Sequence, residues 1–450
     1  MNVKKITVPL RTQGGKMTPK RLQITDNIEL SAIGTDKFKS ELLTLTINLP
    51  LTKENIAYNM LLTSVLKRGT KSYPSIAELN RRLDELYSSS LDIKSARIGK
   101  NLTLTVSADM LDSHYIPDDT AVLCGVLDMI SEVFYTPHLS DGAFPENIVE
   151  QEKKFLTESL DSIVNNTRGY ANTKLSELMF KNDPQFPTVE EMKDITSSIT
   201  NRSLTEFYNH IRDTSPLRIF YVGNTDIEII TKEIRSRFSP WKINRNSPLV
   251  LPYAEPVCKY TSVTEKMPVS QGKLAIGFKT GVCISDDNDR QYAAILLNEI
   301  FGGSAASKLF MNVREKMSLC YYCSSSYDRY TGTMTVSSGI ENKNRQIAES
   351  AIMAELEDIK RGKISDSELD FAKKSLLNGY RQIQDNPYDL QSYYSNRAFF
   401  GFTEDIEQAK QKILEVSISD ISKIAGEIVC DSVYFVEGTA DADEEEYCDE

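Results

Sequence analysis

Two kinds of hydrophobic pattern alternate along this chain. Short runs in which apolar and polar residues alternate predict strands, among them LQITDN, IELSAIG, LLTLTINL, GKLAIGFKT and GTMTVSSGI, and the N-terminal run TVPLRT fits the same pattern. Longer stretches with apolar residues three and four positions apart predict amphipathic helices, the first over residues 54–67. The mixture predicts an α+β fold.

The same order of elements occurs twice. Strands, a helix pair, a strand hairpin, several helices and a closing strand follow one another in both halves. The run LTVS ending at Ser107 matches MTVS ending at Ser337, and the closing strand RIFYVGN resembles VYFVEG. The chain is therefore predicted to contain two homologous domains, each a largely antiparallel sheet covered by helices.

The domain boundary is marked by composition. The stretch SPWKINRNSPLVLPYAEP is rich in proline, has no clear period and suits an extended linker. We predict an N-terminal domain over residues 1–238, a linker over 239–257, a C-terminal domain over 258–440 and an acidic tail over 441–450.

Helix starts carry recognisable capping signals. A Ser or Thr followed three residues later by Glu predicts a capping box, in which each side chain bonds to the backbone of the other residue. The pattern occurs at Thr188, at Ser203 and at Ser365. Each of these residues is predicted to cap a helix.

Composition limits the classes of function. With 450 residues and a net charge of −12, the chain lacks the basic excess that nucleic-acid binding requires. The seven cysteines are odd in number and follow no disulfide framework, which favours free thiols in a reducing compartment. The N-terminus has no apolar signal core and no apolar run reaches membrane-spanning length, so we expect a cytoplasmic protein that binds neither nucleic acid nor membrane.

Residues that could bind a metal are few. The three histidines, His114, His138 and His210, are far apart in sequence, and none lies in an H-E-x-x-H or H-x-x-E-H frame. Cys320 and Cys323 form a single C-x-x-C within a strand-like stretch, where packing in the sheet is the favoured interpretation over a redox or metal role.

The segment LKRGTKSYPS after the first helix resembles the segment that follows the inverted zinc motif in the pitrilysin and insulinase metallopeptidases, which reads roughly HFLEHMLFKGTKKYPS. If the Gly-Thr at Gly69 is matched, the two metal-binding His positions fall on Met60 and Ser64, and the Glu that activates water falls on Thr63. Thioether and hydroxyl groups are poor zinc ligands, and Thr cannot act as a carboxylate base.

The third metal ligand of that family is a Glu on a later helix, seven residues after another Glu. In VEQEKKFLTES the first Glu matches Glu152, which places the ligand position at Ser159. The neighbouring Glu158 lies about 100° further around a helix and is expected to point elsewhere. The resemblance therefore implies that this chain binds no zinc and is not an enzyme on its own.

The second half resembles the non-metal domain of the same peptidases. FGGSAASKLFMNVREKMSLCYY is similar to the family pattern LGG-x-x-SRLF-x-x-LRE-x-x-GLAY, and ISDSELDFAKK is similar to IS-x-EEL-x-x-AK. By this resemblance Arg314 and Tyr321 would hold the scissile region of a substrate. The loop of Gly302, Gly303 and Ser304 would act as a glycine-rich substrate loop, or simply end the preceding helix.

The resemblance is closest to the non-catalytic subunit of bacterial two-chain, processing-peptidase-like enzymes, and it implies half of a clamshell. We expect a substrate-binding partner for a homologous zinc-bearing subunit, in a heterodimer that cleaves peptides or precursors, with a homodimer as an open alternative. A non-enzymatic scaffold or assembly protein, and a peptidase active alone through a displaced metal site, are further alternatives. The net negative charge favours peptides with basic residues.

Overall fold

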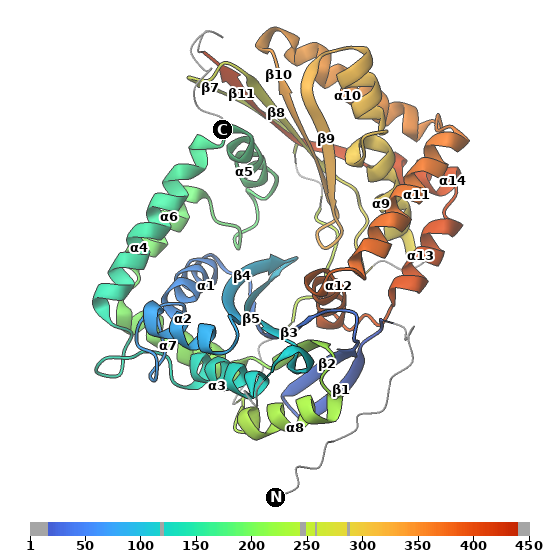
Figure 1. Cartoon of the computed structure of the whole chain (residues 1–450). Helices are drawn as coiled ribbons and strands as arrows, with labels where there is room; N and C mark the ends of the chain where they lie inside the picture. Colours follow the sequence, from blue (N-terminus) through green and yellow to red (C-terminus); the bar gives the residue numbers. More distant parts are fainter. Residues whose placement is uncertain (1–16, 118–120, 244–248, 257–258, 286–288, 440–450) are drawn as a thin grey trace, which may run out of the picture.

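The computed structural model describes residues 17–117, 121–243, 249–256, 259–285 and 289–439 (Figure 1). The predicted strand TVPLRT and the predicted acidic tail lie outside the described residues, as does part of the predicted linker. Among the described residues, no helix combines the length and the apolar character needed to cross a membrane.

The described residues of the first half form six strands and eight α-helices. The strands are β1 (Lys20–Thr25), β2 (Ile28–Gly34), β3 (Ser40–Pro50), β4 (Ser90–Ile98), β5 (Asn101–Leu111) and β6 (Leu217–Gly223). The helices are α1 (Lys53–Leu66), α2 (Ile76–Glu85), α3 (Val122–Tyr135), α4 (Glu146–Asp161), α5 (Thr167–Met179), α6 (Val189–Ser198), α7 (Asn201–Thr214) and α8 (Ile227–Phe238), with 3-10 turns at Ser113–Tyr115 and Ser162–Asn165.

The described part of the second half repeats this series with small differences. Its strands are β7 (Thr261–Met267), β8 (Gly272–Lys279), β9 (Cys320–Asp328), β10 (Thr333–Ile340) and β11 (Val429–Gly438). Its helices are α9 (Arg290–Asn298), α10 (Arg345–Lys360), α11 (Asp366–Ile383), α12 (Pro387–Phe399), α13 (Ile406–Glu415) and α14 (Ile418–Glu427), with a 3-10 turn at Asn342–Asn344. Two segments, Glu299–Gly303 and Leu309–Lys316, are π-helical.

The two sheets share one topology. The strand order is β1-β2-β6-β3-β5-β4 in the first sheet and β7-β11-β8-β10-β9 in the second. The closing strand of the first sheet, β6, pairs in parallel with β2 and antiparallel with β3, and that of the second sheet, β11, pairs in parallel with β7 and antiparallel with β8. Strand β1, which pairs with β2, has no counterpart among the described strands of the second sheet. Because the order and the directions of the remaining strands correspond, the predicted α+β fold with two homologous halves is confirmed.

The helix starts test the capping signals. Thr188 with Glu191 and Ser365 with Glu368 form the predicted capping boxes. The prediction at Ser203 is wrong, because Thr200 caps this helix and Ser203 is its third residue, where its hydroxyl accepts the backbone N–H of Thr200. The N-cap is therefore Thr200, three residues upstream of Ser203.

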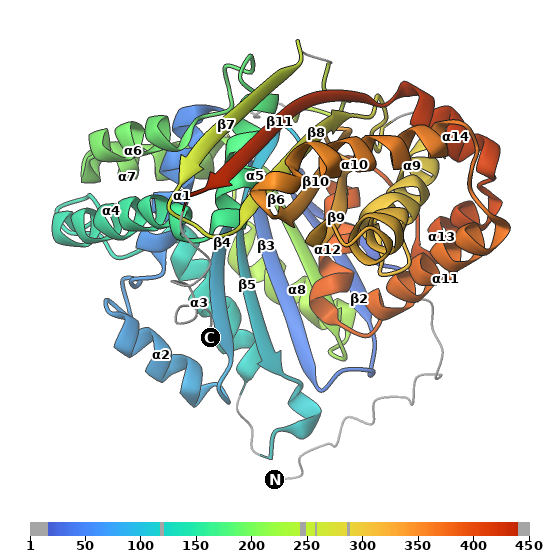
Figure 2. The same ribbon diagram turned by 90° about the horizontal axis from the view of Figure 1, so that it is seen from above.

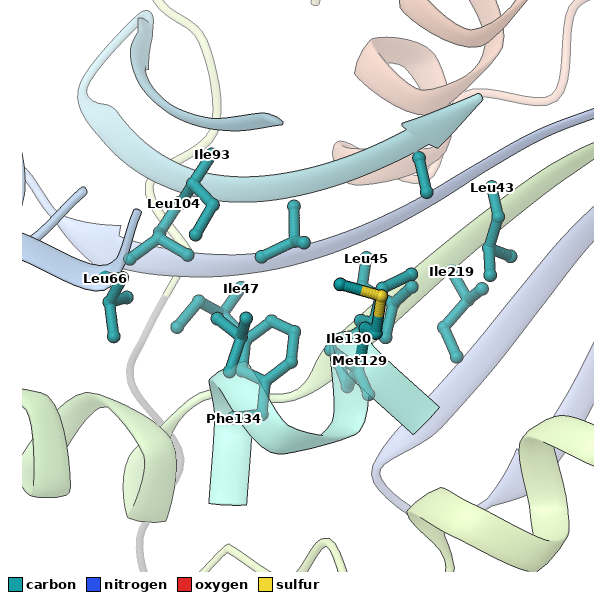
Figure 3. Packing of buried hydrophobic residues seen from close by; sticks show 14 of the residues in the cluster. Leu43, Leu45, Ile47, Leu66, Ile93, Leu104, Met129, Ile130, Phe134 and Ile219 are labelled. Carbon is teal, nitrogen blue, oxygen red and sulfur yellow. The ribbon is translucent and has the colours of Figure 1, made fainter. Parts of the chain in front are cut away.

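Each face of the first sheet packs against a different layer. Leu43, Leu45 and Ile47 on β3 point to the helical layer and meet α3 side chains such as Ile130 and Phe134 (Figure 3). The intervening residues of β3 point to the other face, which α12 of the second half partly covers (Figure 1). The period-two pattern of the sequence thus separates a domain core from an inner face.

The two halves exchange one helix each. Helix α5 belongs to the first half in sequence but packs against β8 and β11 of the second sheet, and α12 of the second half packs against β6 and β3 of the first (Figures 1 and 2). Leu175 of α5 is fully buried in a cluster with Ala275 and Tyr434. In the duplicated order, α5 and α12 hold the same place, so the exchange is reciprocal.

A buried charge cluster fastens the same junction. The ammonium of Lys100, 6% exposed, contacts the carboxylates of Asp183 and Glu255, the latter at 2.8 Å. Burial alone would lower the pKa of Lys100, but its hydrogen bonds to the two carboxylates raise that pKa above its usual value. The cluster connects the end of β4 and the start of β5 with the segments that lead to and from the second half.

We expect Leu175→Ala to lower the free energy of unfolding by about 2–5 kcal/mol, because it opens a cavity between α5 and the second sheet. Urea denaturation followed by circular dichroism measures the change. Leu251→Ala, at a position 57% exposed, is the matched control and should change stability by less than about 0.5 kcal/mol. Equal stability of the two variants would contradict the exchange as a stabilising contact.

Candidate functional site

Helix α1 carries three of the degenerate metal positions. It begins at its N-cap Thr52, whose hydroxyl accepts the backbone N–H of Asn55 at 3.0 Å. Met60, Thr63 and Ser64 lie at i, i+3 and i+4, and so share the face that an inverted zinc motif would use. The α1 backbone therefore presents these positions as a zinc helix would.

The side chains at these positions are turned back onto the helix. The hydroxyl of Thr63, a buried residue, donates to the carbonyl oxygen of Met60 at 2.8 Å, and that of Ser64 donates to the same oxygen at 3.5 Å. Met60 is half-buried and packs against the hydrophobic core of the first half. Such i−3 and i−4 bonds satisfy the hydroxyls within α1, so these groups are not directed at a metal.

The turn after α1 keeps the residues that shape it. A Cβ at Gly69, whose φ is +154°, would lie 2.6 Å from the carbonyl oxygen of Tyr73, so only glycine fits. The hydroxyl of Thr70 donates to the Glu132 carboxylate at 2.6 Å, and the backbone N–H of Thr70 donates to the Tyr73 carbonyl at 2.8 Å. The retained family residues therefore preserve the local backbone. Glu132, which no sequence signal indicated, completes the turn from α3.

Helix α4 packs against α1 and carries the third degenerate position. Glu152 is buried on α4, and the guanidinium of Arg68 binds its carboxylate. Ser159 is exposed, as is Glu158, whose carboxylate lies 3.8 Å from the ammonium of Lys154. The Arg68–Glu152 ion pair was not predicted, although the sequence comparison had singled out Glu152.

No metal site forms elsewhere in the described part of the chain. No group of three or more His, Cys, Asp or Glu residues in it could hold a metal ion. His114 instead contacts the Asp112 carboxylate at 2.7 Å and the side-chain amide of Asn224 at 3.1 Å. His138 uses its backbone N–H to bond the carbonyl of Gly69 at 3.2 Å. Both residues serve the local structure.

Arg314 and Tyr321 lie near each other in sequence but on different elements. Arg314 is in the second π-helical segment, where its guanidinium lies 4.6 Å from the Phe310 ring centroid and its Nε lies 3.6 Å from a carboxylate oxygen of Glu315. Tyr321 on β9 is 61% exposed. Among the described residues neither side chain contacts Met60, Thr63, Ser64 or Ser159, so this chain alone does not bring the two groups together.

A β-bulge sets the position of Tyr321. In the pairing of β9 with β10, Cys320 faces Ile340 and Tyr322 faces Gly339, so Tyr321 is the extra residue. The bulge shifts the alternation by one position. Cys320 and Cys323 consequently lie on the same face of β9, opposite Ile340 and Ser338, and not on alternating faces as a regular strand would place them.

The glycine pair has a packing role. Gly302 belongs to the π-helical segment Glu299–Gly303, and a Cβ there would lie 2.6 Å from the backbone nitrogen of Ser325 on β9. Neither Gly302 nor Gly303 has positive φ, so neither ends its helix in the left-handed form typical of a glycine cap. The hydroxyl of Ser304 donates to the carbonyl of Glu299 at 3.2 Å and closes the segment. A substrate role for this loop stays a prediction.

Comparisons with known proteins agree with this architecture. A family model described as the peptidase M16 inactive domain matches residues 198–376. "Probable inactive metalloprotease YmfF" of Bacillus subtilis (strain 168) is 32% identical over 416 residues, covering 91% of this chain and 96% of that protein. "Uncharacterized zinc protease YmxG" of the same organism is 23% identical over 252 residues, covering 56% of this chain and 59% of that protein.

Solved structures share the fold. A conserved protein from Enterococcus faecalis V583 has a TM-score of 0.86 at 29% identity, covering 95% of this chain and 100% of that one. The peptidase M16 inactive domain from Pseudomonas fluorescens has a TM-score of 0.76 at 14% identity, covering 94% and 99%. The duplicated fold and the metal positions without ligands define the class of inactive metallopeptidase homologues. The chain belongs to the M16 family of pitrilysin- and insulinase-type peptidases, as an inactive member.

We expect the combined changes Met60→His, Thr63→Glu, Ser64→His and Ser159→Glu to create a site that holds about one zinc ion per chain, because they supply two imidazoles and a carboxylate on adjacent helices. Metal analysis after dialysis measures it, with the unchanged protein binding less than stoichiometric zinc. The variant without Ser159→Glu is the matched control and should bind more weakly. Equal affinity would show that Ser159 is not the third ligand position.

The thiol of Cys320 should be reactive at neutral pH. A hydrogen bond with Cys323 lowers the pKa of Cys320 to about 7, and the charge of Arg314 acts in the same direction. A lowered pKa means that thiolate forms at lower pH, so alkylation by iodoacetamide should rise with pH and reach half its maximum rate at about pH 7.

Mass spectrometry of the Cys320 peptide follows that reaction. Cys323→Ala is the informative variant, because it removes the hydrogen-bond donor and should move the midpoint toward the usual thiol value of about 8.5. An unchanged pH profile in that variant would contradict the role of Cys323.

Proposed function

We propose that this chain is the non-catalytic, substrate-binding partner of a homologous zinc-bearing peptidase subunit. The proposal rests on a difference between the metal positions on α1 and the substrate-contact positions in the second half. Thr63 and Ser64 direct their hydroxyls to their own helix, whereas Tyr321 is 61% exposed and forms no hydrogen bond with the described residues. The groups for zinc chemistry are absent, and the groups for substrate contact remain available.

Arg314 is also available for a substrate. Its closest carboxylate, that of Glu315, lies 3.6 Å away and is exposed, and an exposed ion pair of this length contributes little to stability. A guanidinium can donate two parallel hydrogen bonds to peptide carbonyls, and a phenol can donate to a developing oxyanion. In a shared active site, Arg314 and Tyr321 would supply these donors while the partner supplies zinc and the general base.

The first sheet offers a surface for an extended peptide. Among the described strands, β4 pairs only with β5 and forms the edge of the sheet, which suits the addition of a peptide strand. Beside it, between the inner face and α12, lies a cavity of about 440 Å³. Its lining combines strand residues with residues of α12, such as Thr105, Arg218 and Ser392. A peptide added to β4 would place side chains at this cavity.

The charge of this cavity differs from the expectation based on net charge. Its lining includes the basic residues Lys94, Arg97 and Arg218 and the acidic residues Glu29 and Asp92. The Asp92 carboxylate is already paired with Lys67 at 2.8 Å and with Lys94 at 2.9 Å. The lining therefore does not favour basic peptides, and we propose that it accepts peptides with acidic or neutral side chains at this position.

The proposal places both subunits in the cytoplasm as a heterodimer. Free thiols at Cys124, Cys320 and Cys430 support a reducing setting. The test mixes this chain with a homologous chain that carries an intact H-x-x-E-H and measures hydrolysis of a fluorogenic peptide. Activity should require both chains.

We expect Arg314→Ala and Tyr321→Phe each to lower kcat/KM of the mixed enzyme by roughly tenfold to a hundredfold, the cost of losing a charge-assisted or transition-state hydrogen bond. Arg361→Ala and Tyr115→Phe, both at exposed positions, are matched controls and should leave activity unchanged. If the mixture is active and both test variants match the controls, the shared site is wrong, and a scaffold role for this chain is favoured instead.

A further inference from the structure

A second cavity lies within the second half, on the other side of α12 from the cavity beside β4. It has a volume of about 590 Å³, within the range of small-molecule sites. Its walls are the first π-helical segment, the turn between β9 and β10, and helices α11 and α12, which lie together in Figure 1. Ser392 and Asn396 line both cavities, so the two adjoin along α12.

Arg397 is the most deeply buried charge in this wall. It is 4% exposed, and its guanidinium stacks on the Tyr393 ring with its carbon 3.6 Å from the ring centroid. Its Nη1 donates to the Tyr393 carbonyl at a long 3.5 Å, and its Nη2 has no hydrogen-bond partner. The guanidinium therefore keeps donor capacity that the described protein does not use.

The carboxylate nearest to Arg397 is already engaged. Glu404 lies 3.9 Å from Nε of Arg397, but it also accepts the hydroxyl of Tyr292 and pairs with the ammonium of Lys412 at 2.8 Å. Lys412 also pairs with the Asp289 carboxylate at 2.6 Å. Glu404 therefore supplies a counter-charge near Arg397, but at 3.9 Å it is too distant to accept a hydrogen bond from that guanidinium.

The remaining charged groups of the cavity have no ion-pair partner among the described residues. Arg329 lies beside the phenol of Tyr380, and it lines the same cavity as Arg397. Glu299 is 9% exposed, and Asp389 lines the exposed mouth. Unpaired charge in a buried site is costly unless a partner balances it.

The backbone at Glu299 is unusual as well. This residue begins the π-helical segment, which packs so closely on β9 that Gly302 leaves no room for a Cβ. Single π-turns are rare and occur frequently at functional sites, because they redirect a side chain that a regular helix would place elsewhere. Here the π-turn places Glu299 in the wall of the cavity that Arg329 and Arg397 also line.

We propose that this cavity binds a small zwitterion, either a free amino acid or a short peptide with both termini free. The ligand carboxylate would bind Arg329 and Arg397, and its ammonium would bind Glu299. A simple anion would leave Glu299 unbalanced, and a simple cation would leave the guanidiniums unbalanced. Only a ligand with both charges satisfies both sides of the cavity.

The test uses the full chain alone, without a zinc-bearing partner, so that it can fail or succeed independently of the proposed shared active site. Isothermal titration calorimetry compares alanyl-alanine with its N-acetylated form, its C-terminal amide, inorganic phosphate and ethylamine. We expect alanyl-alanine to bind, and blocking either terminus to weaken binding by roughly tenfold to a hundredfold.

Substitutions in the cavity lining test whether alanyl-alanine binds at this site. Glu299→Gln and Arg329→Gln should each weaken binding of alanyl-alanine by a similar factor, roughly tenfold or more. Glu415→Gln and Arg361→Gln, both exposed and outside the cavity lining, are the matched controls. Arg397 is left unchanged because it also packs on Tyr393, and circular dichroism confirms that each variant is folded. If one variant fails to fold, the other still decides the test.

Three results would overturn the proposal. Equal binding of the blocked and free dipeptides would show that the terminal charges are not recognised. Phosphate binding as tightly as the dipeptide would indicate a plain anion site. No binding of any probe at about 10 mM would show that the cavity takes no small zwitterion.

Discussion

The reciprocal exchange of α5 and α12 is the constraint on which the rest of the molecule depends. Each half has its own core between its sheet and its outer helices, but among the described residues the inner face of each sheet is covered by a helix of the other half, α12 on the first sheet and α5 on the second. Leu175 and Met179 of α5 pack against the second sheet. The ion pairs of Lys100 with Asp183 and Glu255 stabilise the same junction between the halves. The inner faces are thus fixed relative to each other, which gives both cavities their walls.

This dependence explains how the zinc ligands could be absent while the fold persists. The metal positions at Thr63 and Ser64 satisfy their polar groups within α1, and the turn at Gly69 is fixed by backbone geometry and by the Thr70–Glu132 bond. None of these interactions needs a metal. The fold takes its stability from apolar burial and from the helix exchange. The side chains at these metal positions are uncharged and their hydroxyls bond within α1, so no charge or polar group there needs a metal to balance it.

The sequence predicted what local patterns determine. Period-two strands, the duplication and the caps at Thr188 and Ser365 all depend on neighbouring residues, and these predictions were confirmed. It could not show the helix exchange, because the residues of α5 and α12 alone do not indicate which of the two sheets each helix covers. It also placed the cap at Ser203 wrongly, since Thr200 offers an equivalent hydroxyl one turn earlier, and it gave no sign of the bulge at Tyr321, which depends on register with β10.

The positions of charged groups likewise depend on the tertiary structure and not on local sequence patterns. A net charge of −12 describes the whole surface, but the two cavities along α12 contain guanidiniums at Arg218, Arg329 and Arg397 that no count of residues could place together. Their positions follow from the exchange, because α12 lies between the two cavities and carries one of these residues itself. Guanidiniums therefore stand beside the inner face in both cavities, together with carboxylates such as Glu29 and Glu299. In the proposed function, contact with a peptide would depend on these side chains and not on a metal bound by this chain.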